Sequence, residues 1–295
     1  MFQEGRSPQE IEPQGEVESK VVIEFSRHGK RENDPNKANK EQMLRKDARP
    51  AAKARGLELK PQPEVSIAFG SQRRRTQDTA ARIMLSGREE ITDEMSLDEI
   101  EASIEKELKS NNLKKIVEDN RLDFKEQEGS PYLYIVENAY KEGKLLSFIV
   151  HESDKKAKEM GDTGSYTYSR NASQVAQIIE KYLNIGNNFQ KVVAKNPDKF
   201  KAFGNQLERY MGTHQSVQES FVAKYLEKVE GVDARDAYVK EIGEGGIAEL
   251  QGIRVEIANK GESQQAMLYA KTANNEWTLV LDKFILDEII AEGMK

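Results

Sequence analysis

The sequence predicts an α/β fold, and three stretches support this prediction. An apolar run at 21–25 ends in an arginine, a histidine and a glycine at 27–29, and an alternating run at 64–69 leads into a helical stretch at 71–83. Short apolar runs rich in β-branched residues predict buried strands. Strand-then-helix units in succession favour parallel pairing. A third stretch, 212–226, leads into a further helical pattern. We therefore expect a three-layer sandwich with a central, mostly parallel sheet, flanking helices and a mainly helical insertion.

The chain of 295 residues is long enough for one large domain or two small ones. Residues 1–19 are polar and acidic with two prolines, unlike a signal peptide or a membrane anchor, and predict a flexible lead-in. Residues 20–295 are expected to form a single domain. A mainly helical insertion is expected at about 96–205.

The composition excludes several classes of protein. A net charge of -6, with 33% charged residues of both signs, disfavours a general nucleic-acid binder. No apolar stretch approaches the roughly 20 residues that span a bilayer. The chain has no cysteine, which rules out disulfides, thiolate chemistry and cysteine-ligated metal sites. We expect a cytoplasmic protein with no nucleic-acid or membrane partner; its oligomeric state is left open.

Propensity and periodicity predict the remaining elements. Residues 37–55 favour a helix that Gly56 would cap, and Ser96 and Glu99 match a capping box within a strongly helical stretch at 91–119. Residues 132–150 give a mixed signal, and 161–167 read as a loop. Three ranges predict further helices, and three predict strands: helices 171–183, 189–207 and 283–291, and strands 247–258, 265–272 and 277–282.

The residues at the first strand end are suited to phosphoryl chemistry. Ligands of open α/β sheets gather beyond the carboxyl ends of the strands, where Arg27 and His28 would emerge. An arginine offers a planar fork of donors for phosphate. A neutral histidine can act as a nucleophile or carry a proton near neutral pH. Arg-His-Gly alone is weak evidence, because a turn at the end of a strand with a solvated arginine can have the same three residues and no catalytic role.

Three motifs in order carry a resemblance to a known family. Arg27-His28-Gly29 after a first strand resembles the signature of the histidine phosphatase superfamily, with its phosphoglycerate-mutase-like fold. The stretch 71–80 fits the pattern Ser-x-x-x-Arg-Thr-x-x-Thr-Ala, which places the second arginine at Arg75. Gly212-Thr213-His214 resembles the later histidine of that family. The resemblance covers the predicted sheet and leaves out the insertion.

The resemblance implies a mechanism. His28 would attack phosphorus and form a phosphohistidine, which water then hydrolyses. Arg27, Arg75 and His214 would hold the phosphoryl oxygens and offset the charge that develops on them. No metal or other cofactor is required. The implied partner is a small phosphorylated substrate whose identity the sequence leaves open.

The proton donor is the least defined part of the predicted site. Leu97-Asp98-Glu99 resembles a Leu-x-Glu that many members carry, so Glu99 is the candidate, although the capping box offers a purely structural role. Glu152 and Glu219 are the reserves. His151 also ends an apolar run, but no amphipathic helix follows it, and we expect it to be structural.

Other residues leave alternatives open. Arg31 extends the first motif as in the acid-phosphatase and phytase branch and would contact substrate, although Asn33 and Gln215 depart from that branch. Arg73 and Arg74 are expected on the surface. The glycine-rich stretch 243–246 precedes a strand and predicts a hairpin or linker. A phosphomutase, or an inactive phosphoester-binding module, would carry the same three motifs.

Overall fold

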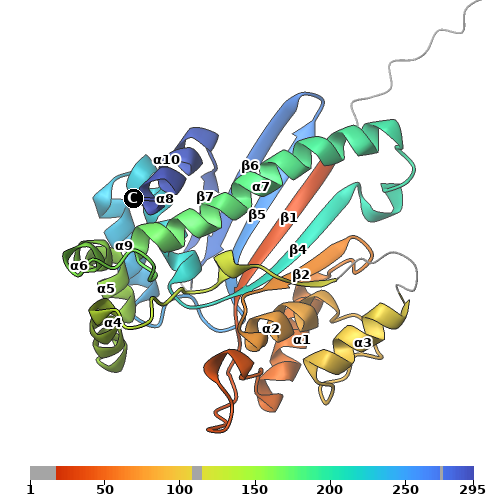
Figure 1. Ribbon diagram of the computed structural model, residues 1–295. Helices are drawn as coiled ribbons and strands as arrows, with labels where there is room; N and C mark the ends of the chain where they lie inside the picture. Colours follow the sequence, from red (N-terminus) through yellow and green to blue (C-terminus); the bar gives the residue numbers. More distant parts are fainter. Residues whose placement is uncertain (1–17, 108–114, 273–274) are drawn as a thin grey trace, which may run out of the picture.

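The computed structural model describes residues 18–107, 115–272 and 275–295, so most of the predicted lead-in lies outside the described residues (Figure 1). One seven-stranded sheet organises it, in the order β3-β2-β4-β1-β5-β6-β7. The strands are β1 (Glu18–Arg27), β2 (Ser66–Gly70), β3 (Ile116–Glu118), β4 (Gln206–Thr213), β5 (Gly252–Lys260), β6 (Ser263–Lys271) and β7 (Glu276–Val280). The α/β prediction is confirmed.

The sheet is mixed, which corrects the expectation of mostly parallel pairing. Strands β3, β2, β4 and β1 run parallel to one another, whereas β5, β6 and β7 continue the sheet in antiparallel pairs. A short turn joins β5 to β6, and only four residues separate β6 from β7 in the sequence; connections this short permit only antiparallel neighbours. In β5, Ile253, Val255 and Ile257 are buried in alternation, as the sequence pattern predicted.

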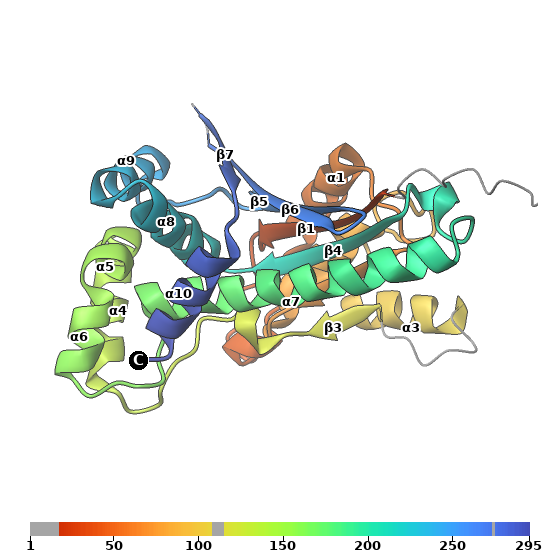
Figure 2. The ribbon, with the colours of Figure 1, turned by 90° about the horizontal axis from the view of Figure 1, so that it is seen from above.

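Helices cover both faces of the sheet (Figure 2). They are α1 (Arg49–Leu59), α2 (Arg74–Met84), α3 (Leu97–Glu107), α4 (Pro131–Lys141), α5 (Leu145–His151), α6 (Ser153–Glu159), α7 (Tyr168–Lys195), α8 (Val217–Val229), α9 (Val232–Ile242) and α10 (Lys283–Gly293). No described helix is both long and apolar enough to cross a bilayer.

Alternate residues of the central strands enter two separate cores. Phe69 and Met211 pack in the large core beneath α7, whereas their neighbours Ala68 and Tyr210 pack with α2 and α3 on the other face. This alternation follows from the two-residue period of a strand. Because helices cover a core on each face of the sheet, the predicted three layers are present.

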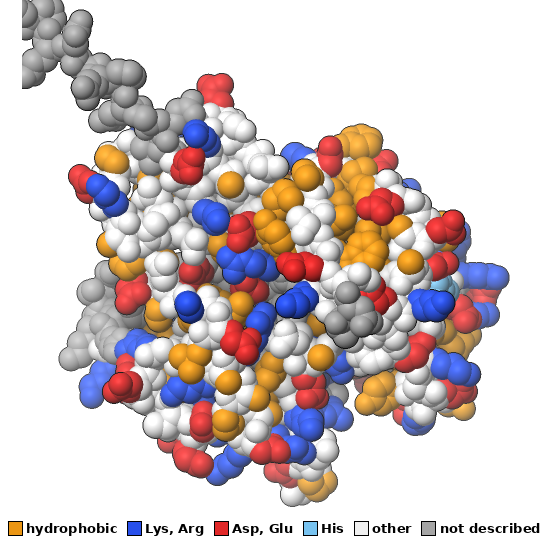
Figure 3. Space-filling view, turned by 180° about the vertical axis from the view of Figure 1, so that it is seen from behind, with side chains coloured by type: hydrophobic (Ala, Val, Ile, Leu, Met, Phe, Trp, Pro, Cys, Tyr) orange, Lys and Arg blue, Asp and Glu red, His pale blue; other side chains and the backbone are white. Residues whose placement is uncertain are grey.

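The surface on the side opposite α7 carries charged and hydrophobic side chains interspersed with one another (Figure 3).

The first helix begins later than predicted. Residues 39–41 and 46–48 form single 3-10 turns, and α1 starts only at Arg49, with Pro50 in its first turn. A proline is tolerated there and not in a helix interior. Gly56 lies inside α1 and does not cap it: a Cβ at this position would lie 2.3 Å from the carbonyl oxygen of Ile83, so Gly56 allows α1 to approach α2 closely.

The stretch 96–205 contributes to the sheet as well as adding helices beside it. The strongly helical signal at 91–119 resolves into α3, which Ser96 and Glu99 cap as predicted, and the short strand β3. Residues 108–114 lie outside the described part. The long helix α7 covers the sheet, while α4, α5 and α6 form a group beyond one end of it (Figure 1).

Strand β4 replaces the last part of a predicted helix. Helix α7 ends at Lys195, and β4 starts at Gln206, within the range 189–207 expected to be helical. Only Gln206 and Leu207 of β4 fall within that range, so the predicted helix overran the start of the strand by two residues. Further along β4, the buried Glu208 accepts hydrogen bonds from the Gln62 backbone N–H, the Ser66 hydroxyl and the Tyr210 hydroxyl.

Candidate active site

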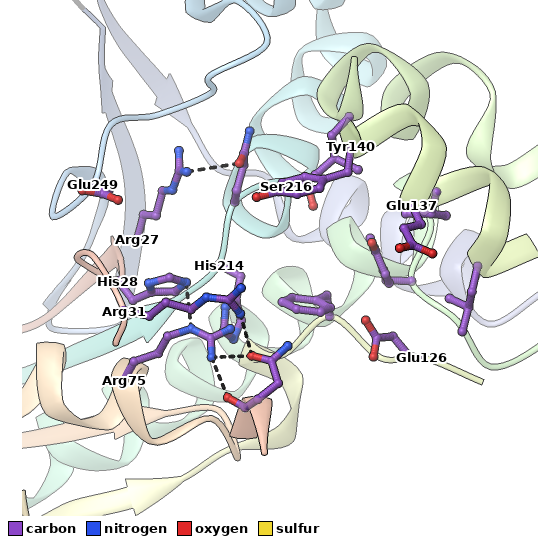
Figure 4. Close-up of a pocket in the computed structure, with 17 residues that line it drawn as sticks. Arg27, His28, Arg31, Arg75, Glu126, Glu137, Tyr140, His214, Ser216 and Glu249 are labelled. Atoms are coloured by element: carbon purple, nitrogen blue, oxygen red, sulfur yellow. Dashed lines mark hydrogen bonds between the residues drawn. The ribbon is translucent and has the colours of Figure 1, made fainter. Parts of the chain in front are cut away.

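The predicted motifs meet at one edge of the sheet, because the parallel strands end there together. Arg27 at the end of β1 pairs in register with Thr213 of β4, and Gly70 at the end of β2 pairs with Gly212. The side chains that follow these strand ends surround a pocket of about 580 Å³ (Figure 4). It is lined by Arg27, His28, Arg31, Asn39, Arg75, Phe124, Glu126, Leu133, Val136, Glu137, Tyr140, Leu145, Tyr166, His214, Gln215, Ser216 and Glu249.

His28 is held in a single tautomer. Its Nδ1 lies 2.7 Å from the carbonyl oxygen of Gly29, and a carbonyl can only accept, so Nδ1 carries the proton. The Arg75 Nε–H donates to Nε2 over 3.1 Å, which requires a lone pair on Nε2. Burial, together with the charges of His214 and Arg75, holds the pKa of His28 well below its usual value. At neutral pH the ring is therefore neutral, with its lone pair on Nε2.

Arg75 and Arg31 converge on one asparagine. Near the start of α2, the buried Arg75 donates through Nη1 to both the carbonyl and the side-chain oxygen of Asn39, each at 3.0 Å. Arg31 donates to the same side-chain oxygen at 2.9 Å. Burial and the charges of Arg73 and Arg31 lower the pKa of Arg75 to about 10, so it remains a cation at neutral pH. Both guanidinium groups line the pocket beside His28 (Figure 4).

Arg27 is fixed by the loop that follows α9. Its Nη1 donates to the carbonyl oxygens of Gly245 at 2.6 Å and Ile247 at 2.9 Å, and its Nη2 donates to the Gln215 side chain at 3.1 Å. The glycine-rich stretch 243–246 thus lies in a linker between α9 and β5, as predicted. The carbonyl of Gly245 within this stretch, and that of Ile247 just after it, orient Arg27 at the pocket.

His214 is buried in the pocket wall after β4. Its Nε2 lies 2.9 Å from the Ser71 hydroxyl and 3.2 Å from Asp123, and its ring centroid is 5.0 Å from that of His28. Among the described residues, Nδ1 has no hydrogen-bond partner. Burial lowers the pKa of His214 to about 4, against the opposing effect of Asp123. The free protein therefore holds His214 neutral, with one ring nitrogen unused.

Asp123 anchors the second histidine and was not singled out from the sequence. Its carboxylate accepts from Gln72 Nε2 and Arg73 Nε, each at 2.8 Å. Burial opposes its ionisation, but the hydrogen bond and charge of His214 and the charge of Arg73 lower its pKa to about 2. The surface position predicted for Arg73 is wrong: Arg73 is buried against Asp123, and its guanidinium carbon lies 3.8 Å above the Phe124 ring. The side chain of Arg74 instead contacts Asp98 near the surface.

The three predicted proton donors do not line the pocket. Glu99 accepts from the Ser96 backbone N–H and hydroxyl at the start of α3, so the predicted catalytic role of Glu99 is corrected to that of a helix cap. Glu152 is exposed between α5 and α6. Glu219 is fully buried beneath the loop that holds Arg27, where it accepts from the Ile247 backbone N–H. His151 ends α5, 3.8 Å from Asp236 and outside the pocket lining.

Three other carboxylates line the pocket instead. Figure 4 shows Glu126 and Glu137 across the pocket from His28, and Glu249 beside Arg27. Glu126 lies 3.7 Å from Arg73, and Glu137 is paired with Lys141 at 2.8 Å. No local motif marks them. Only the spacing of Leu133, Glu137 and Tyr140 along α4 could have indicated a common face.

The described residues contain no group of three or more histidine, aspartate or glutamate side chains arranged to hold a metal ion. The positive charge of the pocket comes from Arg27, Arg31 and Arg75. With the neutral His28 between them, the arrangement can bind a tetrahedral anion and present a nitrogen lone pair to it.

Comparisons with known proteins give only distant similarities. No family model and no curated protein matches the chain. A solved mycobacterial glucosyl-3-phosphoglycerate phosphatase is similar at 15% identity and a TM-score of 0.39, over 82% of this chain and 90% of that one. A phosphoglycerate mutase from Bacillus anthracis is similar at 13% identity and a TM-score of 0.42, over 95% and 99%. A structure described as mycobacterial hydrolase 1 is 15% identical, with a TM-score of 0.43, over 88% and 100%.

These similarities are too distant to carry a functional assignment. The chain's own geometry nevertheless brings the three predicted motifs together. All three sequence motifs follow neighbouring parallel strands, and their side chains line one pocket.

Proposed function

We propose that the protein is a phosphohydrolase that cleaves phosphomonoesters through a phosphohistidine intermediate at His28. The observation that carries this proposal is the state of His28: Nδ1 is tied to the Gly29 carbonyl, and the Nε2 lone pair is held among arginines that line the pocket. A histidine fixed in this way meets the requirement for a nucleophile within reach of a bound anion.

In the first step, His28 Nε2 attacks phosphorus while the ester P–O bond breaks. The N–P bond forms as the leaving oxygen takes the electron pair of the broken bond. The Arg75 Nε–H that now faces Nε2 would turn to a phosphoryl oxygen. Arg27 and Arg31 would offset the charge that develops on the other oxygens.

His214 can add a donor when the anion arrives. Its Nε2 is already engaged by Ser71 and Asp123, and its Nδ1 is unused. A dianionic phosphoryl group beside the ring favours the imidazolium form, because opposite charges raise the pKa of a histidine. His214 would then donate from Nδ1 to the phosphoryl group.

A carboxylic acid would protonate the leaving oxygen and later take a proton from the attacking water. In an in-line displacement the leaving oxygen lies opposite Nε2, on the side of the pocket where Glu126 and Glu137 stand (Figure 4). Water then breaks the N–P bond, releases inorganic phosphate and restores neutral His28. A phosphomutase would share the first step and return the group to a second hydroxyl.

Hydrolysis of p-nitrophenyl phosphate in the presence of a chelator tests the proposal. The wild-type protein and His151→Ala, which removes an exposed histidine away from the pocket, should release p-nitrophenol. His28→Ala should release essentially none. Activity in His28→Ala equal to that of wild type would refute the nucleophile. Vanadate binding without turnover in the wild type would instead identify a binding module or a mutase.

A further inference from the structure

We infer that the site selects phosphomonoesters of apolar or aromatic alcohols, with no second anionic group; this inference rests on the proposed function. The pocket has two unlike sides. Arginines and histidines occupy the sheet edge, and Figure 4 shows Tyr140 across the pocket from them. The rest of the lining forms a wall that is mostly apolar and aromatic. That wall consists of Phe124, Leu133, Val136, Tyr140, Leu145 and Tyr166.

The wall lies where the alcohol part of a substrate must go. With phosphorus beside His28, an in-line leaving group points away from Nε2 and toward α4. Leu133, Val136 and Tyr140 lie on the face of α4 that meets the pocket, and Leu145 begins α5. An apolar alcohol would displace water from these side chains, which stabilises binding by about 25 cal/mol per Å² of apolar surface covered.

Ring contacts hold the aromatic part of the wall in place. Phe124 packs edge-on to His214, with ring centroids 4.7 Å apart, and is tilted against Tyr166 at 5.3 Å. The guanidinium of Arg73 supports the Phe124 ring. A preformed aromatic surface next to the phosphate end favours a flat, apolar group, because no side chain has to be reordered on binding.

The loop 243–247 fixes the distance between the two sides. The Gly245 carbonyl holds Arg27, while the Glu244 carboxylate accepts from the backbone N–H groups of Leu146 and Ser147 at the start of α5. Gln215 also donates to the Glu244 carbonyl at 2.8 Å. The same short segment therefore contacts both Arg27 on the phosphate side of the pocket and the start of α5 on the side of the apolar wall.

Charge on this wall disfavours a second anion. Its carboxylates are Glu126 and Glu137, whose cationic partners Arg73 and Lys141 do not line the pocket. Every arginine that lines the pocket is already gathered at the sheet edge. A substrate with a carboxylate or a second phosphate on its alcohol part would place that charge beside glutamates, without a lysine or arginine to meet it.

Helix α4 provides a matched pair of variants. Tyr140 and Tyr134 are both largely exposed, at 64% and 68%, but only Tyr140 lines the pocket. We expect kcat/KM for 1-naphthyl phosphate to exceed that for 3-phosphoglycerate by at least about 10-fold in the wild type. Tyr140→Ala should lower the naphthyl value about 5-fold through KM. Tyr134→Ala should match the wild type on both substrates.

Binding of non-hydrolysable phosphonates separates the two proposals. Calorimetry should show naphthylmethylphosphonate binding about 10-fold more tightly than methylphosphonate, with the difference reduced in Tyr140→Ala. Equal affinity for the two phosphonates, or tighter binding of 3-phosphoglycerate than of the naphthyl ligand, would overturn the substrate class and leave the proposed phosphohydrolase intact. Absence of binding by either phosphonate would refute the phosphate site itself.

Discussion

At the scale of single residues, the site depends on hydrogen bonds that set protonation states. The Gly29 carbonyl selects the His28 tautomer, and Asp123 occupies one nitrogen of His214. Gly29 belongs to the same motif as His28, whereas Asp123 lies outside all three sequence motifs. In the proposed function, the general acid is one of the two carboxylates that lie across the pocket from His28, Glu126 or Glu137.

The acid should be revealed by the leaving group. The loss of a general acid has little effect when the leaving group is p-nitrophenolate, and a large effect when it is a basic alkoxide. One of the variants Glu126→Gln and Glu137→Gln should therefore lose about 10²-fold in kcat on phenethyl phosphate and keep its turnover of p-nitrophenyl phosphate. Glu249→Gln, from the His28 side of the pocket, is the control and should keep the ratio of the two rates. If Glu126→Gln and Glu137→Gln both kept the wild-type ratio of kcat on phenethyl phosphate to kcat on p-nitrophenyl phosphate, neither glutamate would be the general acid.

Glu219 predicts a pH dependence of stability. Burial raises the pKa of its carboxyl from 4.5 to about 7. Between these two values the folded state binds more protons than the unfolded state, so the free energy of unfolding falls as pH rises through this window. The loss should be on the order of 3 kcal/mol and nearly complete above about pH 7.

Urea unfolding at pH 5 and pH 8 measures this effect. Glu219→Gln keeps an acceptor for the Ile247 backbone N–H and removes the charge, so its stability should fall less than that of wild type between the two pH values. Glu152→Gln changes an exposed glutamate and should follow the wild type. Parallel pH dependence of Glu219→Gln and wild type would contradict the assignment.

At the scale of elements, the close approach of α2 to β4 brings Arg75 and His214 to one pocket. A Cβ at Gly212 would lie 2.0 Å from the carbonyl oxygen of Thr76, in the first turn of α2. Gly212→Ala must push the helix and the strand apart. We expect a loss of about 3 kcal/mol in the free energy of unfolding and a fall in phosphatase activity.

Gly87, in the turn after α2, has open space around its Cβ position and is the matched control. Gly87→Ala should change stability by less than about 0.5 kcal/mol. Denaturant melts of the two variants therefore test the packing directly. Equal stability of Gly212→Ala and Gly87→Ala would show that the helix and the strand do not meet as closely as described.

At the scale of the whole molecule, local sequence patterns predicted the strands and the edge of the sheet where they end. The features that depend on contacts between distant residues could not be predicted in this way. The strand ends at Arg27 and Gly70 carry their own pattern of apolar run and turn, so the strands and the phosphate side of the pocket could be predicted. The burial of Glu208 in β4 could not be predicted, because the groups that satisfy its carboxylate lie far away in sequence, on Gln62 and Ser66. The burial of Arg73 likewise depends on Asp123, 50 residues away.

The apolar wall and its carboxylates had no signature of this kind. Contacts distant in sequence bring them to the pocket: Tyr132 and Val136 of α4 pack in the large core, and Glu244 in the loop after α9 anchors the start of α5. Sequence spacing can show which residues share a face of α4, but not which pocket that face lines. This is why Glu99, with a recognisable local pattern, was predicted to lie in the site, whereas Glu126 and Glu137, which line the pocket, were not singled out.

Direct capture of the intermediate tests the central claim. Wild-type protein is mixed with 1-naphthyl phosphate, quenched in alkali, where phosphohistidine persists, and digested for peptide mass spectrometry. We predict one phosphate on the peptide that contains His28, which is lost on treatment with acid, and none in His28→Ala. Turnover with the phosphate on another residue, or with no covalent phosphate at any time during the reaction, would contradict the account.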